Sequence, residues 1–167
     1  MKRSSVLVVI AMIFTTLLVA TPTHALTDDQ SGAISQNCGT IRQSLHQLQR
    51  ADSRTRVYLG TSYETIISSF MNPLVTRLDK NGSSNAALTA TASEFTTTRN
   101  DFALTFTNYQ KSLEELVNYD CQSDPDGFYD KLQSTRSERA NLNQITIQMR
   151  SLITQQISNV TTLKESL

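Results

Sequence analysis

The chain has 167 residues, and its 15 basic and 15 acidic residues give a formal net charge of zero at pH 7. Charged residues make up only 18% of the chain, and the basic ones form no polybasic run. Because a basic surface patch is the usual footprint of nucleic-acid binding, this composition excludes nucleic acid as an expected partner.

The first 25 residues have the layout of a secretory signal peptide. Lys2 and Arg3 are basic, residues 6–20 form an apolar run, and Ala25 places a small residue before the expected cleavage point. The apolar run is shorter than an ordinary transmembrane helix. We therefore expect residues 1–25 to be removed and the mature protein to be secreted or held in the cell envelope. The alternative is an uncleaved leader that anchors the chain in a membrane.

Residues 26–167 form the expected mature chain of 167 − 25 = 142 residues, which is the size of one domain with a single core. This stretch has 13 basic and 15 acidic residues, a net charge of 13 − 15 = −2. Its 35 serines and threonines predict a surface rich in hydroxyl groups. No glycine-rich or proline-rich tract divides it, so we expect a single helical domain.

A long first helix is predicted by apolar residues that recur every three or four positions. Proline removes a backbone donor and disfavours helical geometry in the preceding residue, so a kink or break is expected near Pro73. Lys80 and Gly82 predict the end of this helix, with Gly82 in a left-handed conformation. The apolar positions are Ile34, Cys38, Ile41, Leu45, Leu48, Leu59, Tyr63, Ile66, Phe70 and Leu74.

Two further helices follow. Ser83, Ser84 or Asn85 can cap the second, while Asp124 and Pro125 suit the N-cap and first position of the third. The second helix has the clearest stripe, in which eight of nine positions are apolar or aromatic: Leu88, Ala92, Phe95, Arg99, Phe102, Phe106, Tyr109, Leu113 and Leu116. The third carries Phe128, Leu132, Leu142, Ile145, Met149, Leu152, Ile153, Ile157, Val160 and Leu163.

Cys38 and Cys121 are the two cysteines of the mature chain, and an even number in a secreted protein indicates a disulfide. They are too far apart for a CxxC redox pair, and His46 alone leaves too few ligands for a zinc site. At about 1.5 Å per residue, the chain climbs roughly 66 Å from Cys38 to Gly82 and descends roughly 58 Å to Cys121. The two cysteines are therefore expected at nearly the same level along the axis of the bundle. These features predict an all-α, elongated antiparallel three-helix bundle, coiled-coil-like and closed by one disulfide.

Polar residues interrupt the apolar stripes and form a candidate buried polar seam, made of Asp52, Arg99, Arg136 and Arg139. Asp52 lies 52 − 38 = 14 residues from the disulfide along the first helix. Arg136 and Arg139 lie 136 − 121 = 15 and 139 − 121 = 18 residues from it along the third. We therefore predict a charge-assisted hydrogen bond from Asp52 to Arg136 or Arg139.

Arg99 is at the height of Gly60, so it is expected to pack across that glycine and meet Glu64. The structural interpretation of the seam is a set of ion pairs that fixes helix register. The functional alternative is a polar pocket inside the bundle.

Two stretches resemble a group of small secreted helical proteins from candidate-phylum bacteria of the Saccharibacteria type. They are residues 52–64 (DSRTRVYLGTSYE) and residues 120–139, with Asp120, Cys121, Pro125, the FYDKL run of 128–132, Arg136 and Arg139. The resemblance implies a bacterial source and a secreted location. It implies no catalytic residue.

No GxSxG, HExxH, P-loop or dinucleotide-binding motif occurs, and His46 stands without a nucleophile or second ligand. We therefore expect neither an enzyme nor a cofactor. The predicted role is structural or interactive, with an unidentified protein partner or a second copy of the chain. The alternative is a small-molecule carrier with a ligand between the helices around Asp52, Arg99 and Arg139.

Overall fold

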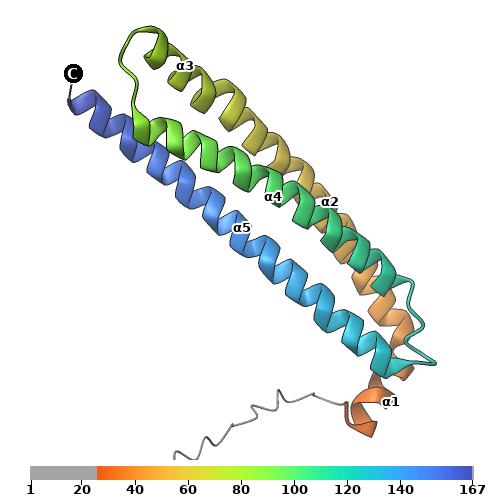
Figure 1. Cartoon of the computed structure of the whole chain (residues 1–167). Helices are drawn as coiled ribbons and strands as arrows, with labels where there is room; N and C mark the ends of the chain where they lie inside the picture. The colour runs from red at the N-terminus through yellow and green to blue at the C-terminus, as the bar shows by residue number, and fades with distance from the viewer. Residues whose placement is uncertain (1–25, 167) are drawn as a thin grey trace, which may run out of the picture.

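The computed structural model describes residues 26–166, and this part of the chain is entirely helical (Figure 1). The predicted signal peptide, residues 1–25, lies outside the described residues. The elements are α1 (Asp28–Gln36), α2 (Cys38–Thr65), the π-helical segment η1 (Ile66–Met71), α3 (Asn72–Lys80), α4 (Ala86–Val117) and α5 (Pro125–Glu165).

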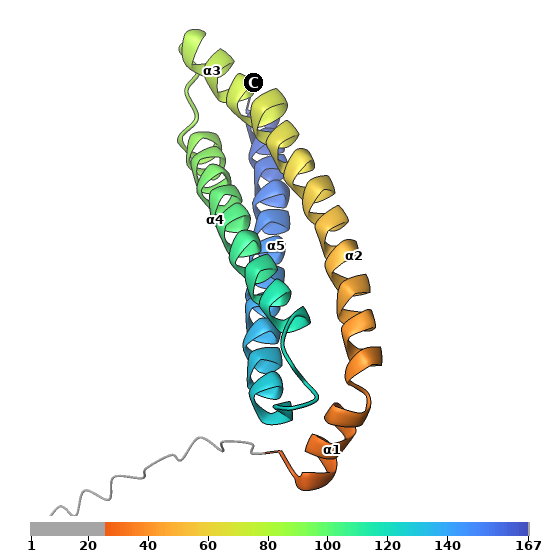
Figure 2. The ribbon, with the colours of Figure 1, turned by 90° about the vertical axis from the view of Figure 1, so that its right-hand side faces the viewer.

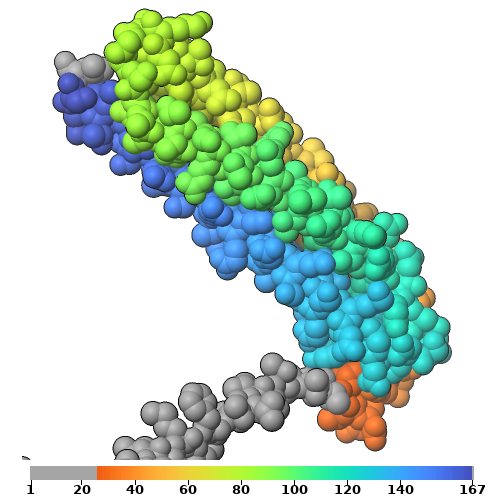
Figure 3. Space-filling model, in the orientation of Figure 1, coloured from red at the N-terminus to blue at the C-terminus, as the bar shows by residue number. Residues whose placement is uncertain are grey.

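The helices form a long antiparallel rod, as the prediction required (Figures 1 and 3). α2, η1 and α3 join end to end into one long helix, α4 returns beside it, and α5 runs back along α4. α4 packs against both neighbours and most extensively against α5 (Figure 2). The Asp52–Arg139 ion pair joins α2 to α5, and grooves remain between α5 and the long joined helix.

The first helix was expected to run from Ile34 through Cys38 without interruption, and this expectation was wrong. Asn37 leaves helical geometry (φ −101°, ψ 11°) and separates α1 from α2. Its side-chain amide donates to the carbonyl of Ala33 at 2.8 Å and closes the end of α1. α1 buries no side chain, and it turns towards the start of α5, where Ser31 donates to Asp126 at 2.9 Å. The fold is therefore three long helices preceded by a short fourth.

The predicted disturbance near Pro73 takes the form of a π-helical turn rather than a break. The N–H of Asn72 bonds to the carbonyl of Ile67, five residues back. A π turn contains one extra residue, so the buried face shifts by one position after it. Ile67 and Met71 are buried, whereas Phe70, expected in the core, is 65% exposed.

The predicted helix ends agree with the structure. Gly82 has a φ of +67°, the left-handed region that a residue without Cβ adopts freely. Asn85 caps α4 by accepting from the N–H of Leu88 at 3.0 Å. Asp124 caps α5 by accepting from the N–H of Gly127 at 2.9 Å. Together these turns set the antiparallel order of the three long helices.

α4 carries the core. Every residue of its predicted stripe is buried except Arg99. Tyr63 of α2 packs edge-on against Phe95 and Phe102, with ring centroids 6.0 and 5.4 Å apart. On α5 the prediction fails near the end, because Ile157 is 62% exposed and Val160 39% exposed. The core therefore ends before α5 does.

Candidate functional site

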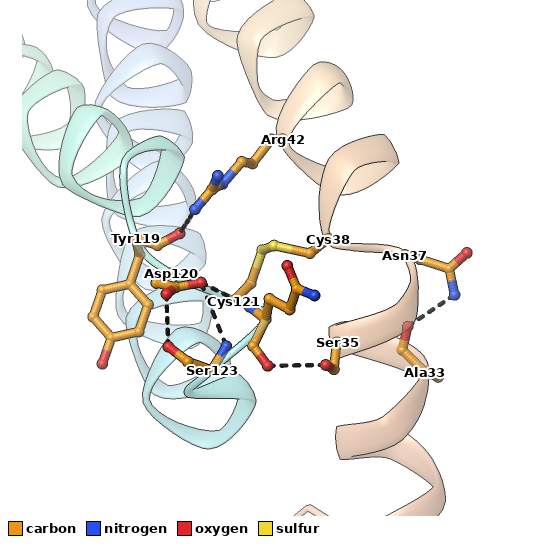
Figure 4. Close-up of a disulfide and its surroundings, with 10 residues drawn as sticks. Ala33, Ser35, Asn37, Cys38, Arg42, Tyr119, Asp120, Cys121 and Ser123 are labelled. Carbon is orange, nitrogen blue, oxygen red and sulfur yellow. Dashed lines mark hydrogen bonds between the residues drawn. A yellow bond between two sulfur atoms is a disulfide. The ribbon is translucent and has the colours of Figure 1, made fainter.

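The disulfide joins the first residue of α2 to the turn between α4 and α5 (Figure 4). The Cα atoms of Cys38 and Cys121 are 5.6 Å apart, which confirms the predicted bridge. Arg42 donates through Nη2 to the carbonyl of Tyr119 at 2.7 Å, and Ser35 donates to the carbonyl of Gln122 at 2.9 Å. This end is joined both covalently and by hydrogen bonds between distant parts of the chain.

The turn next to the disulfide has its own hydrogen bonds. Asp120 accepts from the hydroxyl of Ser123 at 2.7 Å, and this bond, with backbone donors, lowers the pKa of the Asp120 carboxyl. The Tyr119 hydroxyl donates to Asp124. A Cβ on Gly127 would lie 2.3 Å from both of those side-chain oxygens, so glycine allows their close approach.

The centre of the rod contains a polar cluster of Asp52, Tyr109 and Arg139. Arg139 donates to Asp52 from Nε at 3.1 Å and from Nη2 at 3.3 Å. The Tyr109 hydroxyl donates to Oδ2 of Asp52 at 2.7 Å. Burial, and then the hydrogen bond to Asp52, raise the pKa of Tyr109 far above its ordinary 10.0. The cluster therefore links all three long helices through one carboxylate.

The other proposed seam residues lie apart from this carboxylate. Arg136 is exposed and forms no ion pair with any described residue. Arg99 pairs with Glu64, as expected, but their side chains are 37% and 52% exposed. A Cβ at Gly60 would meet nothing within 4 Å, so the expected packing of Arg99 across this glycine was wrong.

A continuous buried seam was therefore also the wrong description. The Asp52 side chain is 17% exposed and that of Arg139 53% exposed. Long arginine side chains bury their aliphatic stems and keep their charged ends near water, which explains the exposure.

Sequence reasoning missed the hydrogen-bonded role of Tyr109, which it treated as core. The available signal was a tyrosine in a stripe whose other aromatic residues are all phenylalanine, since a buried hydroxyl usually requires a partner. It also missed a neighbouring set of hydrogen-bonded side chains on α2 and α4. There, Arg56 donates to Gln110 at 2.9 Å, and Gln110 donates to Ser53 at 2.8 Å.

A groove of about 530 Å³ opens beside the polar cluster, between α2 and α5; we call it the central groove. Its apolar lining comes from all three long helices: Leu59, Phe102, Phe106 and Leu142. Its charged lining is Asp52, Arg136, Arg139 and Arg150. The groove is open to solvent along one side rather than an enclosed cavity.

A second groove, also of about 530 Å³, lies between η1, α3 and the last part of α5; we call it the α3-end groove. Seven of its eleven lining residues are apolar, among them Phe70, Ile157 and Val160. Gln156 also lines it and is only 6% exposed, yet within residues 26–166 neither its amide nitrogen nor its amide oxygen has a hydrogen-bond partner.

Within residues 26–166, no three or more histidine, cysteine or acidic side chains gather in a way that would hold a metal ion. Over the same residues, no helix combines the length and the apolar character needed to cross a membrane. No protein-family model matches the chain, and comparisons with curated proteins and with solved structures gave no match.

Proposed function

We propose that this chain is an interaction protein that works outside the cytoplasm and associates with a second copy of itself through the α3-end groove. The observation that carries the proposal is a buried glutamine amide that finds no hydrogen-bond partner in the described part of the chain and is set among exposed apolar side chains. The disulfide supports the location, because such bonds persist in oxidising compartments.

The exposed apolar residues of the α3-end groove favour burial against another protein. Phe70 is 65% exposed and Ile157 62% exposed, at one end of a chain whose surface is otherwise rich in hydroxyl groups. Grouped apolar side chains on a surface commonly mark a site of protein association. Arg77 is the one charged residue in the lining, so charge repulsion between two copies is small.

Gln156 favours a second copy over other partners. An unpaired buried amide costs about 1–3 kcal/mol, which a partner supplying both a donor and an acceptor would recover. In a two-fold dimer, residues near the axis face their own copies, and a glutamine amide is complementary to itself. The side chains that cover the amide must shift as the copies meet, and such rotamer changes are common at interfaces.

The expected dimer is weak and depends on concentration. Eleven residues line the groove, whereas a standard interface contributes about 20–30 residues from each partner. Sedimentation equilibrium of the oxidised chain should therefore show a monomer–dimer equilibrium in the micromolar range or weaker.

Matched variants test where the two copies meet. Phe70→Ser and Ile157→Ser should each shift the equilibrium to monomer. Leu104→Ser is the control, because Leu104 is similarly exposed, at 64%, but lies on α4 outside the groove. A chain that remains monomeric at millimolar concentration, or a dimer weakened equally by all three variants, would contradict the proposal.

The alternative role, a small-molecule carrier, is favoured by one observation of its own. The central groove has a volume within the range of about 300–1,000 Å³ typical of ligand sites, and Asp52 and Arg139 line it. Arg99, the third residue expected there, does not. The open side of the groove favours the interaction role as the first proposal.

A further inference from the structure

We infer that the central groove binds an amphipathic anion, meaning an acyl chain with a negatively charged head group, and that Arg150 receives the head group. This inference rests on the carrier alternative and is independent of association through the α3-end groove.

The first observation is local excess charge. Three arginines and one aspartate line the groove, a balance of 3 − 1 = +2, in a chain with no net charge overall. Asp52 is already occupied by Arg139 and Tyr109. Neither Arg136 nor Arg150 forms an ion pair with any residue of 26–166. The groove can therefore accept an anion without breaking an existing pair.

The second observation is the shape and chemistry of the groove between these charges. Arg136 and Arg150 are 14 residues apart on α5, a distance of about 21 Å along a helix. Leu59, Phe102 and Leu142 line the interval. Small-molecule sites typically combine such an apolar lining with a few fixed polar groups. An elongated apolar chain would cover these side chains.

Asp52 decides which end takes the head group. Its carboxylate is paired with Arg139 near the Arg136 end, where it competes with an incoming anion for the guanidinium groups. At the other end, Arg150 lies four residues after Thr146 on α5, and both line the groove. The only acidic residue in the lining, Asp52, is paired with Arg139 instead. The geometry therefore places the head group at Arg150 and directs the chain towards Arg136.

Fluorescence titration with dansyl-labelled undecanoic acid tests this inference on the purified chain with its disulfide intact. Arg150→Gln should raise the Kd about tenfold or more, because a charge-assisted contact is lost. Arg136→Gln should raise it about threefold or less, since it removes only longer-range attraction. Arg54→Gln is the control, because Arg54 is exposed on α2 outside the central groove. Thermal melts establish that each variant is folded.

Two further measurements separate the possible outcomes. The methyl ester of the probe should bind at least about tenfold more weakly than the acid, and Phe70→Ser should leave binding of the acid unchanged. Lack of binding, equal binding of acid and ester, or equal Kd values for Arg150→Gln and Arg54→Gln would overturn the inference. A larger effect of Arg136→Gln than of Arg150→Gln would overturn the placement of the head group.

The inferred occupant is a free fatty acid, and the competing source of the same chemistry is the head group of a membrane lipid. Co-sedimentation with phosphatidylglycerol vesicles distinguishes these sources. Pelleting that Arg150→Gln abolishes would assign the groove to a membrane lipid. A chain that stays in the supernatant while binding the dansyl acid would assign it to the free amphiphile.

Discussion

The two ends of the rod differ in what holds their helices together. At the disulfide end, a covalent bond joins α2 to the α4–α5 turn, and Arg42 and Ser35 donate to backbone carbonyls of that turn. At the other end, Asn159 of α5 donates to Thr91 of α4 at 3.1 Å, but among the described residues no hydrogen bond or ion pair joins η1 or α3 to α5. Apolar side chains there remain exposed around the unpaired amide of Gln156.

This difference places the contacts that stabilise the fold at one end of the rod and the proposed binding surface at the other. The disulfide end fixes the relative height of the helices, and the aromatic core of α4 continues that register along the rod. Because the register is fixed elsewhere, the α3 end can retain exposed apolar side chains that would otherwise be buried in a core. Regions of low local stability are the usual sites of binding and conformational change.

Removing the disulfide should have the largest effect. The double variant Cys38→Ser with Cys121→Ser opens a loop with a sequence separation of 83, and should lose about 4 kcal/mol of unfolding free energy in the chain-entropy model. Urea denaturation of the variant and of the oxidised chain measures the difference. A loss below about 1 kcal/mol would show that helix packing alone fixes the disulfide end.

Asp52→Ala should have the next largest effect, at about 2 kcal/mol, because the buried Tyr109 hydroxyl loses its acceptor and Arg139 loses its partner. Arg136→Ala serves as the control and should change stability by less than about 0.5 kcal/mol. If Asp52→Ala leaves the melting temperature unchanged and abolishes binding of a ligand or partner, the structural role of the cluster is wrong. The carrier role would then take first place.

Alkaline pH should weaken the same cluster. The pKa of Tyr109 is raised in the folded chain, by burial and by Asp52. Its proton is therefore retained after an unfolded chain has lost it. The contribution of Tyr109 to the free energy of unfolding should be constant below pH 10. Above pH 10 the free energy of unfolding should fall by about 1.4 kcal/mol per pH unit for this one proton. Tyr109→Phe should reduce this slope by about one proton, measured by urea denaturation across the alkaline range. An unchanged slope would contradict the assignment.

Gln156→Leu should have the smallest effect on stability, and the effect should be favourable. Replacing an unpaired buried amide by an apolar group of similar size should stabilise the dilute monomer by about 1 kcal/mol. The same change should weaken the dimer, because the self-complementary amide is lost. Thermal melts at low protein concentration test the stability of the monomer, and sedimentation at high concentration tests the weakening of the dimer. A destabilised monomer would indicate that the amide has a partner in solution.

The sequence was sufficient for features governed by local chemistry. The α4 stripe, the caps at Asn85 and Asp124, and the left-handed Gly82 depend on residues close to one another in the chain. The disulfide could be predicted because two helices of similar length return the cysteines to one height.

Features that depend on a shift of helical phase could not be predicted. A stripe spaced by three and four residues continues through Phe70 on the assumption of an unbroken α-helix, whereas the π turn moves Met71 into the core instead. Pro73 indicated a disturbance but not its kind.

The sequence alone also could not decide whether Arg136 or Arg139 pairs with Asp52. Counting residues favoured Arg136, which is nearly level with Asp52. Side chains on a helix lean towards its N-terminus, so the guanidinium of Arg139 lies back from its own Cα and reaches the level of Asp52.

Hydrogen exchange of the oxidised chain at two concentrations tests the difference between the ends most directly. At low concentration, residues 66–80 and 150–163 should exchange faster than the centre of α4. At high concentration, protection should rise in those two segments and stay unchanged around Cys38 and Cys121. Protection that does not depend on concentration, or that rises at the disulfide end instead, would contradict the account.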